Sequence, residues 1–412
     1  MNREKRTEPV LHDVTTQWEA KLCDRCTLMS SSAIREILKF TQQPDVISFA
    51  GGLPAPEIFP VKEVEEATIH VLRNAGREAL QYTTTEGVLS LRQALAEKMH
   101  AYGIAAEPDN IFPTNGSQQA LDLLGRIFIG KDDVIITGSP TYLGALQAFR
   151  TYEPRIVGIP IDDNGMRVDL LGDVLKKEQV KFIYILPNFH NPMGVTLSLE
   201  RRIELVKIAA KHGTPIFEDD PYRELRFEGK DLPGISELHK ENVIYMSTFS
   251  KILAPGLRLG WVVAPQVIIS KLVQAKQATD LHTSTFIQMI VAEIMKRGLL
   301  AGHSKLINQV YGERRHIMTE AMEEHFPEGV RWTKPEGGLF LWVTTPETID
   351  TTELLKEAIK RKVAFVPGTS FFPQGGGTNT MRLNFSNAKP EMIREGIKRL
   401  GATLEEAVAK AR

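Results

Sequence analysis

The sequence predicts an α/β fold in which a mostly parallel sheet carries helices on both faces, together with a smaller α+β domain. Three observations lead to this prediction. Through the middle of the chain, short β-branched runs alternate with amphipathic stretches, the pattern of a parallel sheet with crossover helices. Towards the C-terminus, three short strands are instead accompanied by two helices. The chain has 412 residues, enough for one to three domains with a large core.

Five apolar runs predict strands of the large sheet. Between two of them, apolar side chains at positions 199, 203, 205, 206 and 209 have the spacing of one helix face. A helix over residues 199–211 is therefore expected to cross over between neighbouring strands. The predicted strands are residues 133–137, 181–186, 215–218, 242–246 and 259–264.

The C-terminal part predicts strands at residues 339–343, 363–366 and 381–385, with helices at 352–361 and 390–410. A helical pattern over about 268–323 predicts one long connector between the two parts. We therefore expect residues 1–60 to join the small domain, residues 61–305 to form the large domain, and residues 306–412 to form the small C-terminal domain.

Composition and charge narrow the class of protein. Hydrophobic residues make up 42 % and charged residues 25 % of the chain, which is ordinary for a globular protein. The 50 basic and 51 acidic residues give no basic field that would hold nucleic acid or an anionic membrane. There is no membrane-spanning run and no apolar signal near the start, so we expect a cytoplasmic protein. Cys23 and Cys26 are the only cysteines and have no companion cluster, so no metal site is expected.

Residues that carry chemistry follow the predicted strands. Ligands of open α/β sheets bind beyond the carboxyl ends of the strands, so these segments are expected to share one crevice. The segments are residues 138–142, 187–194, 219–222 and 247–251.

Lys251 and Arg258 suggest a nucleophile beside an anion site. A lysine in a crevice near another cation can have a lowered pKa and form Schiff bases. Ser250 and the guanidinium of Arg258 suit a phosphate. The ordinary reading of a loop lysine, a solvated surface side chain, stays open for Lys251 taken alone.

Two further positions have both a functional and an ordinary reading. Ser117 opens an amphipathic helix after a short strand, where backbone N–H groups and the hydroxyl can bind phosphate. The alternative is a simple helix cap. Asp219 ends a strand, and if it is buried it needs a cationic partner. The alternative is a helix cap or a loop carboxylate.

The ordered set of motifs resembles the class I/II pyridoxal-phosphate aminotransferases. The resemblance runs from about residue 30 to the C-terminus and is nearest to the 2-aminoadipate, kynurenine and aromatic aminotransferase branch. One departure is Met193, where the family usually has Thr or another small residue. The motifs are Asn191-Pro192-x-Gly194, Asp219-x-x-Tyr222, Ser250-Lys251, Arg258 and Arg382.

The resemblance implies the type I fold of pyridoxal-phosphate-dependent transferases, with a seven-stranded large sheet and pyridoxal 5′-phosphate as cofactor. It implies that Lys251 carries the cofactor as a Schiff base, that Asp219 meets the pyridine nitrogen, and that Tyr142 stacks on the ring. It also implies that Tyr222 and Asn191 contact the phenolic oxygen. The phosphate would be held by Ser117, Gln118, Thr248, Ser250 and Arg258.

Substrate and partner residues are implied in the same way. Arg382 would bind the substrate carboxylate, assisted by Asn191 and the Gly52 backbone. Tyr82 would reach the phosphate of a neighbouring subunit, which implies a homodimer with shared active sites. Ser32 and Arg35 lie on a predicted helix over about residues 30–40. There Arg35 would meet the distal carboxylate of acidic substrates, unless it lies on a solvated face.

The expected reaction moves the amino group of an L-amino acid to a 2-oxo acid such as 2-oxoglutarate by a ping-pong mechanism, with Lys251 as general base. Donors left open are 2-aminoadipate, glutamate, aromatic and branched aliphatic amino acids. A lyase or decarboxylase on the same fold is an alternative. An aminotransferase-like transcription regulator is another, although no helix-turn-helix pattern precedes the matched region. His190 is either a titrating group or a structural histidine.

Overall fold

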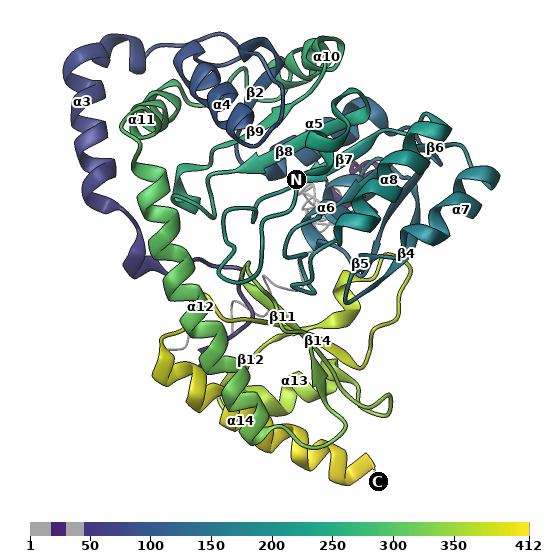
Figure 1. Ribbon diagram of the computed structural model, residues 1–412. Helices are drawn as coiled ribbons and strands as arrows, with labels where there is room; N and C mark the ends of the chain where they lie inside the picture. Colours follow the sequence, from purple (N-terminus) through teal and green to yellow (C-terminus); the bar gives the residue numbers. More distant parts are fainter. Residues whose placement is uncertain (1–17, 30–44, 412) are drawn as a thin grey trace, which may run out of the picture.

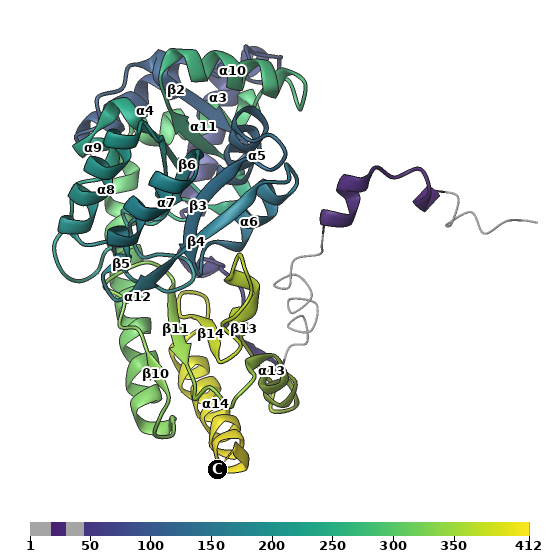
Figure 2. The same ribbon diagram turned by 90° about the vertical axis from the view of Figure 1, so that its right-hand side faces the viewer.

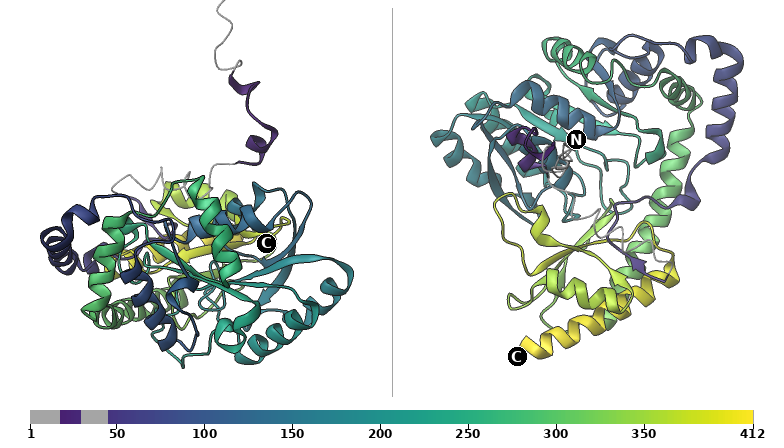
Figure 3. Two further views of the ribbon diagram at one scale, coloured as in Figure 1. Left: turned by 90° about the horizontal axis from the view of Figure 1, so that it is seen from above. Right: turned by 180° about the vertical axis from the view of Figure 1, so that it is seen from behind.

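The computed structural model describes residues 18–29 and 45–411. Ser32, Arg35 and the helix predicted around them lie outside the described residues. Figure 1 shows a large sheet with its helices above a smaller sheet, and Figure 3 shows the same division from behind. Within the described residues, no helix has both the length and the apolar character that a bilayer crossing requires.

The large sheet has the strand order β2-β9-β8-β7-β6-β3-β4-β5. Neighbours from β4 to β8 pair in parallel, whereas β9 is antiparallel to both β8 and β2. The expected seven strands are present, and a two-residue eighth strand, β5, folds back on β4. The strands are β2 (Ile111–Thr114), β3 (Val134–Ser139), β4 (Arg155–Asp162), β5 (Gly165–Met166), β6 (Val180–Ile185), β7 (Ile216–Asp219), β8 (Val243–Thr248) and β9 (Gly260–Val263).

Both faces of this sheet are covered, because successive side chains of each strand point to opposite faces. On β6, Phe182 and Tyr184 join one hydrophobic cluster, whereas Ile183 and Ile185 join the other. Figure 2 shows helices on either side of the strands. One face packs on α5 (Ser117–Phe128), α6 (Leu143–Arg150) and α10 (Gln266–Gln277), and the other on α7 (Leu171–Lys177), α8 (Leu199–His212) and α9 (Ile235–Leu238).

The single long connector predicted over residues 268–323 is wrong. The chain forms three helices there, and α12 (Leu299–His325) runs from the large sheet to the small one (Figure 1). The breaks have local causes. Leu281 has a φ of 67°, Ser284 caps α11 (Thr285–Lys296), and Gly298 has a φ of 70°. At the outer edge, α3 (Val61–Ala79) and α4 (Leu89–Ala101) pack on α11.

The small sheet has the order β10-β11-β14-β13 and is antiparallel. The strand predicted over residues 363–366 is two: β12 pairs with β1 near the N-terminus, and β13 pairs with β14. The boundary predicted after residue 305 falls inside α12 and stays a prediction. The elements are β1 (Ile47–Ser48), β10 (Arg331–Trp332), β11 (Phe340–Thr344), β12 (Val363–Ala364), β13 (Val366–Pro367), β14 (Thr380–Asn384), α13 (Thr351–Lys360) and α14 (Pro390–Ala411).

Candidate active site

Lys251 lies just beyond the end of β8, and its amine points to the N-terminal segment. Nζ donates a hydrogen bond to Gly52 O at 2.7 Å. Burial and, to a smaller extent, the cations of Arg382 and Arg258 together lower the pKa of Lys251 to about 8. Far more of this amine is therefore uncharged near neutrality than in an ordinary lysine, as a nucleophile or a base requires.

Asp219 ends β7 and its carboxylate is buried, with 2 % of the residue exposed. Oδ2 accepts a hydrogen bond from Tyr184 at 2.7 Å. Oδ1 has no hydrogen-bond partner among the described residues. Burial raises the pKa of Asp219 to about 7, against the opposing hydrogen bond from Tyr184. Such an oxygen is suited to a cationic N–H donor, which would restore the charged form.

An anion cradle lies where α5 begins. Gly116 has a φ of 73°, and a Cβ on it would stand 2.6 Å from Arg258 Nη2. A Cβ on Gly260 would stand 2.8 Å from Ser117 N. The two glycines thus let Arg258 and β9 pack closely against the start of α5, which places a guanidinium beside the N-terminus of that helix, an arrangement suited to phosphate.

Two hydroxyls complete the cradle. Thr248 Oγ1 lies 2.9 Å from Ser250 Oγ and 3.1 Å from the carbonyl of Leu259. Because Leu259 follows Arg258, this contact ties the hydroxyl pair to the turn that carries the guanidinium. Hydroxyls and a guanidinium together favour a doubly charged oxyanion.

Tyr142 lies between the cradle and Asp219. Its hydroxyl donates to Gln118 Oε1 at 3.3 Å, and Gln118 Nε2 donates to Gly144 O at 2.8 Å. Burial raises the pKa of Tyr142 to about 12, and the charge of Asp219 adds to the rise. The phenol therefore remains neutral, and its half-buried ring is available for stacking.

Arg382 on β14 lies between two aromatic rings. Its guanidinium carbon is 4.2 Å from the centroid of Phe340 and 5.1 Å from that of Phe371. Nη1 donates to Asn191 Oδ1 at 2.9 Å and Nη2 to Ala50 O at 2.7 Å. Burial lowers its pKa to about 10, so it stays a cation at neutral pH. A fixed planar cation suits bidentate binding of a carboxylate.

Asn191 joins the two sides of the crevice. Its Nδ2 donates to the hydroxyl of Tyr222 at 3.3 Å, while its Oδ1 accepts from Arg382. Burial raises the pKa of Tyr222 above its usual range, so this hydroxyl stays protonated. A side chain beside Lys251 that offers both a donor and an acceptor can orient a ligand between β7 and β14.

The structure does not bring every predicted residue into this group. Tyr82 lies in the loop after α3 with 78 % of its surface exposed, and its ring meets that of His282 edge-on at 5.7 Å. His190 is buried, which lowers its pKa to about 3. A histidine that stays neutral favours the structural reading. Met193 is buried beside the Asn191 turn.

Sequence analysis missed Tyr184, Phe340 and Phe371. Tyr184 had a usable signal, because a tyrosine inside a buried strand needs a partner for its hydroxyl. Phe340 and Phe371 had no such signal in the sequence, because they reach Arg382 from other segments of the small part of the molecule.

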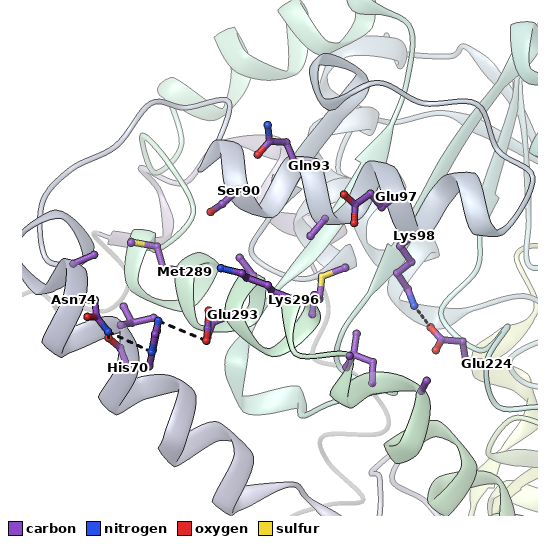
Figure 4. Close-up of a pocket in the computed structure, with 18 residues that line it drawn as sticks. His70, Asn74, Ser90, Gln93, Glu97, Lys98, Glu224, Met289, Glu293 and Lys296 are labelled. Carbon is purple, nitrogen blue, oxygen red and sulfur yellow. Dashed lines mark hydrogen bonds and ion pairs between the residues drawn. The ribbon is translucent and has the colours of Figure 1, made fainter.

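A separate groove of about 770 Å³ lies among α3, α4, α11 and α12 (Figure 4). Several of its charged side chains form ion pairs with one another. Lys98 Nζ is 2.7 Å from Glu224 Oε1, and His70 Nε2 is 3.6 Å from Glu293 Oε1. None of the crevice residues described above lines it. The crevice around Lys251 is therefore the candidate active site.

Comparisons with known proteins identify the family of this chain. A family model described as aminotransferase class I and II matches residues 44–400. Aromatic-amino-acid aminotransferase 1 of Thermococcus litoralis is 48 % identical over 100 % of both chains. The solved structure of a multiple substrate aminotransferase from Thermococcus profundus has a TM-score of 0.92 and 46 % identity, covering 95 % of this chain and 99 % of that one.

A second solved structure is that of α-aminoadipate aminotransferase from Thermus thermophilus, complexed with N-(5′-phosphopyridoxyl)-L-leucine. It has a TM-score of 0.90 and 40 % identity, covering 95 % of this chain and 99 % of that one. These similarities confirm the predicted type I fold and the prediction that the chain catalyses amino-acid transamination. The chain belongs to the class I and II aminotransferases and is an amino-acid transaminase.

Proposed function

We propose that this transaminase holds pyridoxal 5′-phosphate in the crevice around Lys251. The family implies this cofactor, and the related Thermus structure contains its phosphopyridoxyl form. The observation that carries the proposal is the buried Asp219 oxygen, which lacks a partner among the described residues, in one crevice with Lys251 and an anion cradle. These groups fit a cationic ring nitrogen, an aldehyde and a phosphate.

Each predicted residue then has a role. Lys251 would hold the cofactor covalently through Nζ, and Asp219 Oδ1 would accept from the ring nitrogen. Asn191 and Tyr222 would contact the phenolic oxygen, and Tyr142 would lie against the ring. When bound, the cofactor supplies an electron sink for the substrate Cα and carries the amino group between substrates. The phosphate would be held by Ser117, Gln118, Thr248, Ser250 and Arg258.

Lys251 also acts as the general base. Once released by the incoming amine, Nζ removes the proton from the substrate Cα and holds it for return. The cations of Arg382 and Arg258 favour the uncharged amine that this step needs. Arg382, whose buried Nε has no partner among the described residues, would bind the substrate carboxylate in a bidentate contact, assisted by Asn191 and the Gly52 backbone.

The proposed donors are 2-aminoadipate, glutamate, aromatic and branched aliphatic amino acids, with 2-oxoglutarate as acceptor. Relatives named for aromatic, aminoadipate and multiple substrates support a broad pocket. Ser32 and Arg35 remain proposed substrate residues outside the described part of the chain, with Arg35 taking the distal carboxylate of acidic donors. A cytoplasmic location stays a prediction.

We further propose a homodimer in which Tyr82 reaches the phosphate of the neighbouring subunit. Tyr82 is exposed on this protomer, and apolar Ile69, Leu72 and Leu80 are exposed near it in sequence. Analytical ultracentrifugation of the Tyr82→Phe variant and its parent, with cofactor affinity measured on both, tests this arrangement. Weaker cofactor binding in an unchanged dimer supports it, and unchanged affinity contradicts it.

A panel of amino donors with 2-oxoglutarate as acceptor tests the reaction and its substrates. We expect glutamate formation with acidic and apolar donors and no turnover without the oxo acid. Continuous release of ammonia, pyruvate or carbon dioxide without an acceptor would instead identify a lyase or decarboxylase.

A further inference from the structure

Behind Asp219 lies a set of buried charges that the reaction does not use. Because side chains alternate along a strand, Glu218 and Asp220 face away from Asp219. Arg202 of α8 lies on that face, and the residue has no exposed surface. Burial lowers the pKa of Arg202, and the charges of Glu218 and Asp220 oppose this. A charge buried this deeply is retained only where its hydrogen bonds are satisfied.

Arg202 holds both ends of the loop that carries Asn191. Its Nε donates to Leu197 O at 2.9 Å, and its Nη2 donates to Pro187 O at 3.1 Å. Leu197 N also donates to Pro187 O at 2.8 Å, which closes the loop. The guanidinium therefore fixes the base of residues 187–197, with Asn191 near the tip.

The same guanidinium reaches the loop that carries Tyr222. Nη2 donates to Asn188 Oδ1 at 2.6 Å, and Asn188 Nδ2 donates to Asp220 Oδ1 at 2.8 Å. Asp220 in turn is held to β8, because its N–H donates to Met246 O at 2.9 Å. The loops after β6 and β7 are thus joined at their bases through Asn188 and at their tips through Asn191 and Tyr222.

We propose that Arg202 is a positioning residue that sets Asn191 and Tyr222 at hydrogen-bond distance from each other and from the phenolic oxygen of the cofactor. This inference rests on the proposed function. The planar fork of an arginine serves both ends of the loop and the Asn188 amide at once, which the point charge of a lysine does not. Pro233 O accepts from Nη1 at 2.8 Å, so all three nitrogens of the fork are engaged.

The neighbouring Arg201 provides a matched control on the same helix. It donates to Asp162 Oδ2 at 2.8 Å and to Gly165 O at 2.8 Å. Its described hydrogen bonds reach no residue of the loop 187–197. Arg201→Met therefore removes a similar set of bonds and leaves the Asn191–Tyr222 contact in place.

The experiment compares Arg202→Met and Arg201→Met, both loaded with cofactor, by absorption at a series of pH values. The measured quantity is the midpoint for protonation of the nitrogen that joins Lys251 to the cofactor. Donors at the phenolic oxygen withdraw the negative charge that favours this protonation, so loosening them raises the midpoint. We expect a rise of about one pH unit for Arg202→Met, the equivalent of one weakened hydrogen bond to a charged group, and none for Arg201→Met.

Thermal unfolding of the cofactor-free variants separates positioning from stability. The inference holds if both variants lose stability and the midpoint rises only in Arg202→Met. It fails if the two midpoints agree. If Arg202→Met does not fold, Asn188→Ala decides: a rise supports the positioning role and an unchanged midpoint overturns it. A parent protein that forms no lysine-linked, absorbing cofactor would overturn the proposed function itself.

Discussion

The candidate active site has two sides, a proposed cofactor floor and a proposed substrate wall, and the two are built differently. The cofactor floor is formed by Ser117, Asp219, Tyr222, Lys251 and Arg258. These residues lie at or next to the ends of strands of the large sheet, or in the first turn of α5. The substrate wall is formed by Gly52, Phe340, Phe371 and Arg382, which come from the N-terminal segment and the small part of the molecule.

Each side keeps a buried polar atom without a partner among the described residues, one suited to the proposed cofactor and the other to a substrate. On the floor, Asp219 keeps an oxygen without a partner within the described chain, ready for a ligand. On the wall, the two Nη atoms of Arg382 bond Asn191 and Ala50, and its buried Nε has no partner within the described chain and is available to a substrate carboxylate. We therefore expect floor substitutions to change the rate of chemistry and wall substitutions to change affinity and substrate choice.

The largest effect is expected for Lys251→Ala, which removes both the covalent anchor and the base. Turnover should fall by at least about a thousandfold. The cradle should still bind cofactor, but without a bond to protein that borohydride can reduce. Mass spectrometry after reduction provides the measurement, and an adduct that persists in Lys251→Ala would contradict the assignment.

Asp219→Asn tests the charge on the floor while keeping the shape of the side chain. The half-reaction with an amino acid should slow by roughly 10²–10³-fold in stopped-flow absorbance, with cofactor still bound. Tyr184→Phe removes the supporting hydrogen bond at Oδ2 and should slow it by about tenfold. Near-normal rates in Asp219→Asn would reject its role at the ring nitrogen.

Arg382→Lys tests the wall, because it keeps the charge and removes the planar fork. The KM for amino donors should rise by about 100-fold, near 3 kcal/mol. The absorption of the lysine-linked cofactor should be unchanged, since the floor is intact. If the substitution lowers kcat and leaves KM unaltered, the division between floor and wall is wrong.

Arg35→Ala tests whether the substrate wall includes a contact to the distal carboxylate of acidic donors. Use of 2-aminoadipate and glutamate should weaken by roughly 1–3 kcal/mol in transition-state terms, with leucine and aromatic donors much less affected. The informative quantity is the ratio of kcat/KM values for acidic and apolar donors in variant and parent. An unchanged ratio would indicate that Arg35 lies on a solvated face and does not contact the substrate.

The smallest expected effect is the pH dependence of cofactor capture, the rate at which the cofactor-free protein forms its covalent bond to the cofactor. The pKa of Lys251 is lowered to about 8, and the uncharged amine is the reactive form. Capture by the cofactor-free protein should therefore accelerate as pH rises through about 8 and level off above it. Stopped-flow absorbance gives the profile. A rise that continues towards the ordinary lysine value near 10.5 would show that the amine is solvated.

The floor was largely predictable from sequence, because its residues follow apolar strands in contiguous motifs. Lys251, Asp219 and Ser117 lie where those strands end. The wall was less accessible, since Phe340 and Phe371 approach Arg382 only through the tertiary fold. Tyr184 was missed, although a tyrosine inside a buried run needs a partner for its hydroxyl.

The errors in the fold have similar causes. A helical pattern over residues 268–323 does not reveal that Leu281 and Gly298 adopt positive φ and divide it into three helices. The run over residues 363–366 gives no sign that its two halves pair with different sheets. In both cases the sequence pattern is continuous across the break: the helix breaks follow from local backbone conformation, whereas the strand pairings depend on β1 and β14, which are separate segments of the chain.

The most direct test of the central claim is a single turnover without acceptor. The cofactor-loaded protein is mixed with an excess of amino donor, and the 2-oxo acid formed is counted per active site. We predict one equivalent, then a stop that 2-oxoglutarate relieves, because the amino group would stay on the bound cofactor until an oxo acid accepts it. Continued product release without any acceptor would contradict transamination in this crevice.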